Sequence, residues 1–323
     1  MTEVELTETE QLERELTETE PTELLPGMII SGLWSGNEYR IERMLGEGAN
    51  GQVFLARNGK NGMHYALKLG NRDTDLKPEI ALLKKISPTV TNGKSLFVEA
   101  DIFTEKAASR PYYVMRYVEG VTLVQFVTEA GRDWLYVVGY HLLRRLAQIH
   151  GKGFAYGDLK PSNVLVSGEG RVDLIDFGGA ARFGKPIRQC TPAYDREFWN
   201  CGIRIADSGY DLFSFAMLFM QLTGVEIPGA LSEEVELLPH ERNGELLKER
   251  LRANEACLPV ADILSDMIDG RYVDSRKALA AWRVEAVKAG LPPARESRFG
   301  LLNGLIAASL LVAAVSVYMI VTQ

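Results

Sequence analysis

Two polar motifs near the middle of the chain limit its fold and chemistry more than any other feature. The first is Tyr156-Gly-Asp-Leu-Lys-Pro-Ser-Asn163, and the second is Asp176-Phe-Gly178, which begins thirteen residues after Asn163, behind an apolar run. Phosphoryl transfer from MgATP needs a carboxylate facing the acceptor hydroxyl, a cation for the developing charge, and oxygen ligands for the metal ion. The two motifs contain residues for all three tasks.

These motifs assign a role to four side chains. We expect Asp158 to face the acceptor hydroxyl and Lys160 to stabilise the developing charge. Asn163 and Asp176 offer the oxygen ligands that Mg²⁺ prefers, and they would suit Mn²⁺ in its place. The sequence therefore predicts an enzyme that uses ATP and a divalent metal ion.

A glycine-rich segment precedes the two motifs and supports the same chemistry. It has Gly46, Gly48 and Gly51 at the spacing G-x-G-x-x-G, followed by Val53 in a strand-like run. Glycine lets the backbone approach a phosphate closely, because no Cβ obstructs it and positive φ costs little. A dinucleotide-binding fold would need these glycines to open a helix. The strand pattern after them instead favours a glycine-rich flap over ATP.

A single lysine, Lys68, ends the apolar run that begins at Tyr65. A lysine at a strand edge is ordinarily a solvated surface residue. In this context it fits the strand lysine that binds the α- and β-phosphates of ATP and is held by a glutamate on a helix. The best partner is Glu79, which begins an amphipathic helix pattern over residues 78–86 with Pro78 near its start. The short spacing from Lys68 to Glu79 predicts an abbreviated strand-to-helix connection.

The pattern of the chain changes near residue 118. Short β-rich runs such as 52–56 and 65–69 precede this point, and longer helical patterns such as 136–150 and 211–222 follow it. With 46% hydrophobic residues among 323, the composition excludes a wholly disordered, collagen-like or multi-span membrane protein. We therefore expect an α+β fold with a small sheet-rich lobe to about residue 118 and a larger helical lobe after it.

The motifs together resemble those of the eukaryotic-like (Hanks-type) Ser/Thr protein kinases over about residues 38–280. The chain is similar in particular to the small membrane-anchored kinases of spore-forming bacteria, of the YabT type. The stretches that carry the resemblance are residues 34–39, 45–51, 156–161, 194–199 and 210–213. The resemblance implies a two-lobed kinase domain over residues 26–283, transfer of the γ-phosphoryl group of ATP to protein hydroxyls, and a membrane signalling role linked to sporulation.

The family also implies roles for residues that the motifs alone do not assign. Met115 would be the gatekeeper, and the backbone near Val118 would pair with adenine. Thr191 matches the threonine that helps to position the catalytic aspartate and lysine. Asp211 resembles the helix aspartate that braces the catalytic loop, and it could also be the N-cap of a helix starting at Leu212.

The sequence departs from the usual kinase pattern at the catalytic loop. Gly157 stands where many kinases have arginine before the catalytic aspartate, and Tyr156 stands where histidine is usual. Without that guanidinium, a phosphate on the activation segment has no bidentate partner at this position. We therefore do not expect activation-loop phosphorylation to be the switch. The usual Ala-Pro-Glu is also absent, and Glu197 lies one position from the expected glutamate.

Two alternatives to a protein kinase remain open on the sequence. Gly157-Asp158 with the later Asn163 and Asp176 is also compatible with small-molecule phosphotransferases of the aminoglycoside and choline kinase type. Lys160, the full glycine motif and the segment from Thr191 favour a protein substrate. The second alternative is a pseudokinase scaffold or a DNA-linked membrane tether, which Gly157 and the basic stretch from Arg271 to Arg298 motivate.

The first 25 residues form a separate, strongly acidic segment. They carry a net charge of −8 and repeat Glu-Leu-Thr-Glu-Thr-Glu at residues 5–10 and 15–20. Because so few of these residues are apolar, we expect a disordered arm. The rest of the chain is nearly neutral, which argues against a strongly basic nucleic-acid coat.

The other end of the chain predicts a membrane anchor. Residues 301–322 include no charged side chain, and this length of helix crosses a hydrocarbon core of about 30 Å. Arginines at 295 and 298 would keep the preceding domain cytoplasmic. We therefore expect a single-pass protein of the cell membrane. The pair Gly304 and Ala308 is compatible with a homodimer but is too common to require one.

A basic stretch precedes the predicted anchor and includes the linker expected at residues 284–300. Between residues 271 and 298, seven basic residues face three acidic ones. Such a stretch could contact anionic lipid head groups or DNA, and beside a membrane helix the lipid contact is the preferred interpretation. The protein substrates themselves are not identified by any motif.

Overall fold

The computed structural model describes residues 24–48, 51–71, 76–90, 96–105, 108–188, 190–225, 227 and 237–288. The chain divides after Val118 into two compact units, unit 1 (Met1–Val118) and unit 2 (Glu119–Gln323). Nearly all of the predicted acidic arm and the whole predicted membrane segment lie outside the described residues. Within the described residues, no helix is long and apolar enough to span a bilayer.

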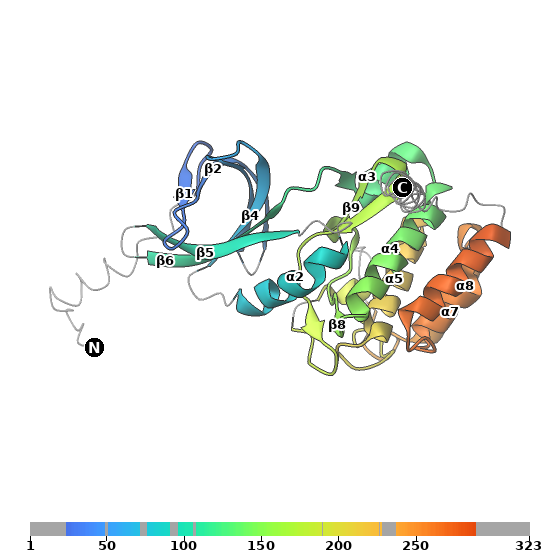
Figure 1. Ribbon diagram of the computed structural model, residues 1–323. Helices are drawn as coiled ribbons and strands as arrows, with labels where there is room; N and C mark the ends of the chain where they lie inside the picture. Colours follow the sequence, from blue (N-terminus) through green and yellow to red (C-terminus); the bar gives the residue numbers. More distant parts are fainter. Residues whose placement is uncertain are drawn as a thin grey trace, which may run out of the picture. The chain divides into compact units, whose positions relative to one another are not determined.

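Unit 1 is built on one antiparallel sheet with the strand order β1-β2-β3-β4-β6-β5 (Figure 1). The strands are β1 (Ile29–Ser31), β2 (Glu38–Gly48), β3 (Gly51–Asn58), β4 (His64–Gly70), β5 (Phe97–Glu105) and β6 (Ala108–Arg116). Strands β3 and β4 confirm the two strands predicted at 52–56 and 65–69. Unit 1 is thus sheet-rich, as the sequence predicted.

The core of unit 1 is formed by the side chains that these strands direct to one face of the sheet. Because successive side chains point to opposite faces of a sheet, Phe54 and Ala56 on β3 share a face, as do Leu67 and Leu69 on β4. All four are fully buried. The helix α2 (Lys77–Val90) lies against β5 and buries one apolar stripe, which includes Leu83.

Unit 2 is mainly helical, again as predicted. Its helices are α3 (Leu123–Ala130), α4 (Trp134–His150), α5 (Ser208–Leu222), α6 (Gly244–Ala253), α7 (Ala261–Ile268) and α8 (Ser275–Lys288). Helix α5 is apolar around most of its circumference, and it contacts α4 and α7 in the interior of the unit (Figure 1). It begins at Ser208, with Asp207 as the N-cap that accepts a hydrogen bond from the backbone of Tyr210. The interpretation of Asp211 as the N-cap is therefore wrong.

Short strands and 3₁₀ turns of unit 2 carry the polar motifs. Strands β7 (Val121–Thr122), β9 (Val164–Ser167) and β10 (Arg171–Leu174) form one small sheet, and β8 (Phe154–Ala155) pairs with β11 (Ala181–Arg182). The 3₁₀ turns are η1 (Pro161–Asn163), η2 (Gly168–Gly170), η3 (Pro192–Tyr194) and η4 (Glu255–Val260). The motif around Asp158 therefore lies between β8 and η1.

The last described helix, α8, is held in the core of unit 2 by Trp282. This side chain is fully buried, contacts the rings of Phe215 and Phe219 on α5, and donates a hydrogen bond to the backbone oxygen of Tyr136 at 3.0 Å. A Cβ at Gly139 on α4 would lie 2.5 Å from the indole, so this position admits only glycine. Helix α8 continues across the domain boundary expected after residue 283.

Candidate active site

The three predicted catalytic residues meet in unit 2. The ammonium group of Lys160 lies 2.8 Å from Asp158 Oδ2 and donates to Thr191 Oγ1 at 3.2 Å. The Thr191 hydroxyl in turn donates to Asp158 Oδ1 at 2.9 Å. The Asp158 side chain is 4% exposed, so its carboxylate is fixed in one orientation by two partners from different segments. A carboxylate held in this way, beside a cation, can accept a proton from a hydroxyl placed against it.

The two predicted metal ligands are neighbours in space. The backbone amide of Ile175 donates to the carbonyl of Asn163 at 3.0 Å, which places Asp176 directly after this contact. The Asn163 amide nitrogen donates to the backbone oxygen of Asp158 at 2.9 Å, and its Oδ1 has no hydrogen-bond partner among the described residues. Asp176 adopts φ = 58°, a left-handed conformation uncommon for aspartate.

These donors fit a magnesium ion. Mg²⁺ binds oxygen ligands and in phosphoryl-transfer sites uses one or two protein side chains together with substrate phosphates. Asn163 and Asp176 supply one amide oxygen and one carboxylate. No group of three or more His, Cys, Asp or Glu side chains that could hold a metal occurs in the part of the chain that the structure describes. With one amide oxygen and one carboxylate as protein ligands, a bound Mg²⁺ would take its other ligands from phosphate oxygens or water.

Asp211 braces the catalytic loop, as the family resemblance implied. Its carboxylate accepts hydrogen bonds from the backbone amides of Tyr156 at 2.6 Å and Gly157 at 2.8 Å, and it lies 2.8 Å from His150 Nε2. The other ring nitrogen of His150 contacts the hydroxyl of Ser275 at 2.9 Å. Because Asp211 is fully buried, these contacts fix the backbone directly before Asp158.

Tyr156 takes the place of the usual histidine and makes different contacts. Its hydroxyl donates to the backbone oxygen of Ile175, and its ring meets that of Phe177 edge-on at 5.5 Å. Both rings are buried. Tyr156 thus joins the catalytic loop to the Asp176-Phe-Gly178 motif by one hydrogen bond and one aromatic contact.

Gly157 cannot carry a side chain in this backbone. Its φ is +84°, and a Cβ built on it would lie 2.1 Å from the carbonyl oxygen of Gly179. An atom at that distance from a backbone oxygen forces the two segments apart. The arginine that many kinases have at this position is therefore excluded by the close approach of Gly157 and Gly179.

The activation segment after Gly178 makes backbone hydrogen bonds to two other parts of unit 2. Strand β11 pairs with β8, and Phe183 donates from its backbone to Gly153. Further along, Gly184 bonds to Ala206, and Ile187 bonds to Arg204. Backbone hydrogen bonds thus hold this segment without any added group.

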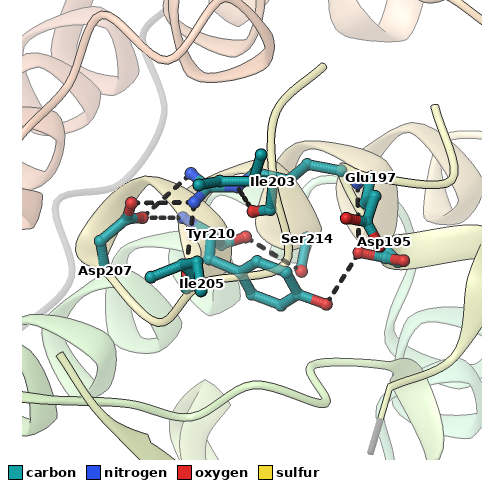
Figure 2. A network of polar contacts seen from close by, with 8 residues as sticks. Asp195, Glu197, Ile203, Ile205, Asp207, Tyr210 and Ser214 are labelled. Carbon is teal, nitrogen blue, oxygen red and sulfur yellow. Dashed lines mark hydrogen bonds and ion pairs between the residues drawn. The ribbon is translucent and has the colours of Figure 1, made fainter. Parts of the chain in front are cut away.

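An ion pair that sequence reasoning missed anchors the end of the segment. The carboxylate of Asp195 is fully buried and accepts hydrogen bonds from the Arg204 guanidinium. It also accepts one from the Tyr210 hydroxyl at 3.0 Å (Figure 2). Glu197 is half-exposed and lies 3.3 Å from the same guanidinium. Asp195 therefore makes the buried anchoring contact, whereas Glu197 only adds an exposed one.

A second ion pair connects the two ends of the loop between residues 196 and 207. Arg196 binds Asp207, the N-cap of α5, at 2.8 and 3.0 Å, and it donates to the backbone oxygens of Ile203 and Ile205 (Figure 2). The sequence signals near these pairs were the resemblance over residues 194–199 and a local excess of charged residues, and neither identified the partners. Their partners depend on the turn between residues 196 and 207, which no periodic pattern reveals.

In unit 1, Lys68 forms the predicted pair with Glu79. The ammonium group lies 3.0 and 3.1 Å from the two carboxylate oxygens, and both side chains are about 95% buried. The hydroxyl of Tyr113 also donates to Glu79, at 2.6 Å. Residues 71–76 connect β4 to α2, which is the short connection that the spacing predicted.

The glycine motif forms the β2–β3 hairpin, with Gly46 paired to Val53 and Gly48 paired to Gly51. Gly51 needs to be glycine, because its φ is +131° and a Cβ would lie 2.1 Å from the backbone oxygen of Leu69. Gly46 and Gly48 have no described atom within 4 Å of such a Cβ. Packing among the described residues therefore does not explain these two glycines, whereas close approach by a ligand would.

The two residues assigned to adenine binding lie at the end of the sheet. Met115 is on β6, buried to 6% exposure and paired with Ala66 and Phe97 on the neighbouring strands. Val118 follows β6 and is the last residue of unit 1. Their positions suit the start of a connection between the two units.

Comparison with known families decides the class of this fold. The model of the protein kinase domain matches residues 39–261. The chain belongs to the protein kinase family. Within that family it is similar to the serine/threonine-protein kinase YabT of Bacillus subtilis, with 37% identity over 198 residues, which cover 60% of this chain and 58% of YabT.

Two further relatives are less similar to this chain. The cAMP-dependent protein kinase type 3 of Saccharomyces cerevisiae is 28% identical over 209 residues, covering 57% of this chain and 51% of the yeast protein. The serine/threonine-protein kinase ArnS of Sulfolobus acidocaldarius is 29% identical over 208 residues, covering 50% and 33%. The chain thus spans little more than half of YabT and of the yeast enzyme, and a third of ArnS.

Proposed function

We propose that this chain is an ATP-dependent Ser/Thr protein kinase that transfers the γ-phosphoryl group of MgATP to hydroxyl groups of proteins. The observation that carries the proposal is the closed set of contacts among Asp158, Lys160 and Thr191. The family match and the similarity to YabT support the same activity. Lys160, the full glycine motif and the segment from Thr191 favour a protein acceptor over a small alcohol.

The reaction forms a bond between the acceptor oxygen and the γ-phosphorus and breaks the bond to the bridging oxygen of ADP. Asp158 accepts the acceptor proton, and Lys160 offsets the negative charge on the transferred group. Mg²⁺, or Mn²⁺ in its place, supplies charge neutralisation on the phosphates when held by Asn163 and Asp176. Thr191 keeps the Asp158 carboxylate in one orientation throughout.

The roles proposed for unit 1 concern the nucleotide. Lys68, held by Glu79, binds the α- and β-phosphates, and the turn with Gly46, Gly48 and Gly51 covers them, with Val53 following. The backbone near Val118 pairs with adenine beside Met115. The open space at two of the glycines and the buried ion pair support these assignments.

The test compares two carboxylate-to-amide variants of the full chain. Asp158→Asn should lower kcat by at least a hundredfold with little change in the KM for ATP, because this carboxylate meets the acceptor and not the nucleotide. Glu129→Gln, at an exposed position of α3, is the matched control and should retain turnover. Labelled phosphate from ATP is offered to a protein mixture and to a panel of small alcohols. Transfer only to the alcohols would indicate a small-molecule kinase, and no transfer at all would indicate a pseudokinase.

We propose that the kinase does not depend on phosphate in its activation segment. Residues 177–190 contain no Ser, Thr or Tyr, and Thr191 is engaged by Asp158 and Lys160. The segment is already held by backbone hydrogen bonds and by the Asp195–Arg204 pair. Phosphatase-treated enzyme should therefore act on an added substrate without a lag. A lag that disappears after preincubation with MgATP would contradict this.

We also propose that residues 301–322 anchor the kinase in the cell membrane, with the kinase domain in the cytoplasm. The support is the uncharged sequence of this segment and the arginines before it. The basic stretch before the anchor would contact anionic lipid, with DNA as the competing ligand, and the anchor could pair in a homodimer. Full-length protein should remain with membranes after carbonate extraction. Its release into the soluble fraction would refute the anchor.

A further inference from the structure

The activation segment carries an unbalanced positive charge. Between Phe177 and Tyr194 the sequence contains Arg182, Lys185 and Arg188 and no acidic residue. All three side chains are exposed. None of them has a carboxylate partner among the described residues, although the guanidinium of Arg182 lies 5.9 Å from the centre of the buried Phe154 ring.

These three cations differ from the other arginines nearby. Arg196 and Arg204 follow Thr191, and both are already neutralised, by Asp207 and Asp195 respectively. The charges of Arg182, Lys185 and Arg188 are therefore not neutralised by any carboxylate in the described part of the fold. Keeping three like charges on one segment costs electrostatic free energy, and an anionic ligand would relieve it.

The backbone under the three cations is fixed and leads to the catalytic aspartate. Arg182 pairs in the sheet with Phe154, four residues before Asp158. The backbone oxygen of Lys185 accepts a hydrogen bond from Ala206. Arg188 follows the buried Ile187 and stands three residues before Thr191, whose hydroxyl binds Asp158. The three cations thus lie on the segment that runs from the strand pair before the catalytic loop to Thr191, the residue that binds Asp158.

An acceptor of matching chemistry lies in the chain itself. The first 25 residues contain six threonines and no serine, and each of these threonines is followed directly by glutamate. The segment has nine glutamates and a single arginine. A threonine surrounded by carboxylates is the hydroxyl that a basic activation segment would attract most strongly.

We propose that Arg182, Lys185 and Arg188 select acidic acceptor sequences, and that the threonines of the acidic arm at residues 1–25 are phosphorylated by this kinase. The proposal rests on the protein kinase activity proposed above and adds the substrate class of that site. The bond that forms joins the threonine Oγ1 to the γ-phosphorus of ATP, ADP leaves, and the hydroxyl proton passes to Asp158.

The first experiment measures kcat/KM of the full chain for two peptides. One has the sequence of residues 1–25, and the other has glutamine in place of every glutamate. We expect a preference for the acidic peptide on the order of tenfold, since each exposed ion pair contributes a factor of roughly 1.5 to 5. The preference should also fall with added salt.

Two triple variants locate the origin of the preference. Replacing Arg182, Lys185 and Arg188 by glutamine should bring the ratio between the two peptides close to one. The matched control replaces three exposed cations on α6 and α8 by glutamine, namely Arg252, Lys277 and Arg283, and should keep the ratio. Equal use of both peptides by the unmodified chain, or an unchanged ratio in the first variant, overturns the proposal. Transfer to neither peptide by a chain that still phosphorylates the protein mixture overturns this proposal alone, whereas transfer to neither the peptides nor the mixture overturns the kinase activity as well.

The second experiment maps phosphate on the full chain by mass spectrometry after incubation with MgATP. Phosphothreonine within residues 1–25 is expected, and its absence while the acidic peptide is a good substrate would overturn the assignment of the arm. Mixing with an Asp158→Asn chain separates the two sources of acceptor. Phosphate on the inactive chain shows transfer between molecules, and phosphate confined to the active chain shows transfer within one.

Discussion

The close approach of Gly157 and Gly179 permits a controlled test of the catalytic loop. Gly157 has φ = +84°, and Gly184 in the same unit has φ = +80°. A Cβ at Gly157 would lie 2.1 Å from a backbone oxygen, whereas one at Gly184 would have no atom within 4 Å. Alanine at either position therefore meets the same backbone strain, and only alanine at 157 meets a collision.

The two variants should differ by the cost of that collision. Positive φ costs an alanine about 1–2 kcal/mol, which is the whole expected effect of Gly184→Ala. At Gly157 the segments must also separate by roughly 1 Å, and overpacking of this kind adds about 1–3 kcal/mol. For a unit of this size, each 1 kcal/mol lowers Tm by about 2–4 °C, so Gly157→Ala should melt about 2–12 °C below Gly184→Ala.

Activity should separate the two variants further. Asp158 is the next residue after Gly157, and a misplacement of about 1 Å can cost on the order of a hundredfold in rate. We expect Gly157→Ala to lose kcat to this extent and Gly184→Ala to keep most of it. Thermal unfolding and steady-state phosphorylation of the full chain give the two measurements. Equal Tm and equal kcat in both variants would refute the argument.

Two further predictions concern buried charge. Lys68→Ala should abolish activity and destabilise unit 1 by about 3–5 kcal/mol, because it leaves Glu79 buried without its cation. Adding Glu79→Gln should restore stability, measured by urea unfolding, but not activity. Equal stability of the single and double variants would contradict this. Burial and the guanidinium groups of Arg144, Arg145 and Arg171 lower the pKa of His141 from 6.5 to about 4. The unfolded chain therefore binds a proton in this window that the folded chain does not, so the free energy of unfolding should fall as pH decreases from 6.5 to 4. His141→Gln should reduce that fall, and an unchanged pH dependence would argue against it.

The sequence predicted those parts of the site that lie within continuous motifs. Asp158, Lys160 and Asn163 are close in the chain, and their residue types and order along it were sufficient to predict a role for each. Lys68 and Glu79 could be paired because, after the glycine motif, a strand lysine fits the residue that binds phosphates and is held by a helix glutamate, and Glu79 begins the next helix. Strands and helices with clear periodicity, such as β3 and α4, were also predicted, because burial of one face leaves a regular pattern.

The parts that were missed depend on contacts between loops. The pair Asp195–Arg204 forms across an irregular turn, and two charges nine residues apart in a loop have many alternative partners. The approach of Gly157 to Gly179 depends on the backbone path of two separate segments. The sequence predicted the start of α5 too late, because both Asp207 and Asp211 are suitable N-cap residue types and only the structure shows that Asp207 accepts the capping hydrogen bond.

The position of Trp282 has a mechanical consequence for the catalytic loop. Helix α8 reaches that loop through Ser275, which contacts His150, which in turn contacts Asp211. Any pull on the chain beyond Lys288 enters α8 at its opposite end and meets Trp282 first. The indole is packed against the rings of Phe215 and Phe219 on α5, so α5 would bear part of such a load two turns before it reached Ser275. A pull at the C-terminal end of α8 should therefore disturb the packing of Trp282 before it disturbs the contacts that support Asp158.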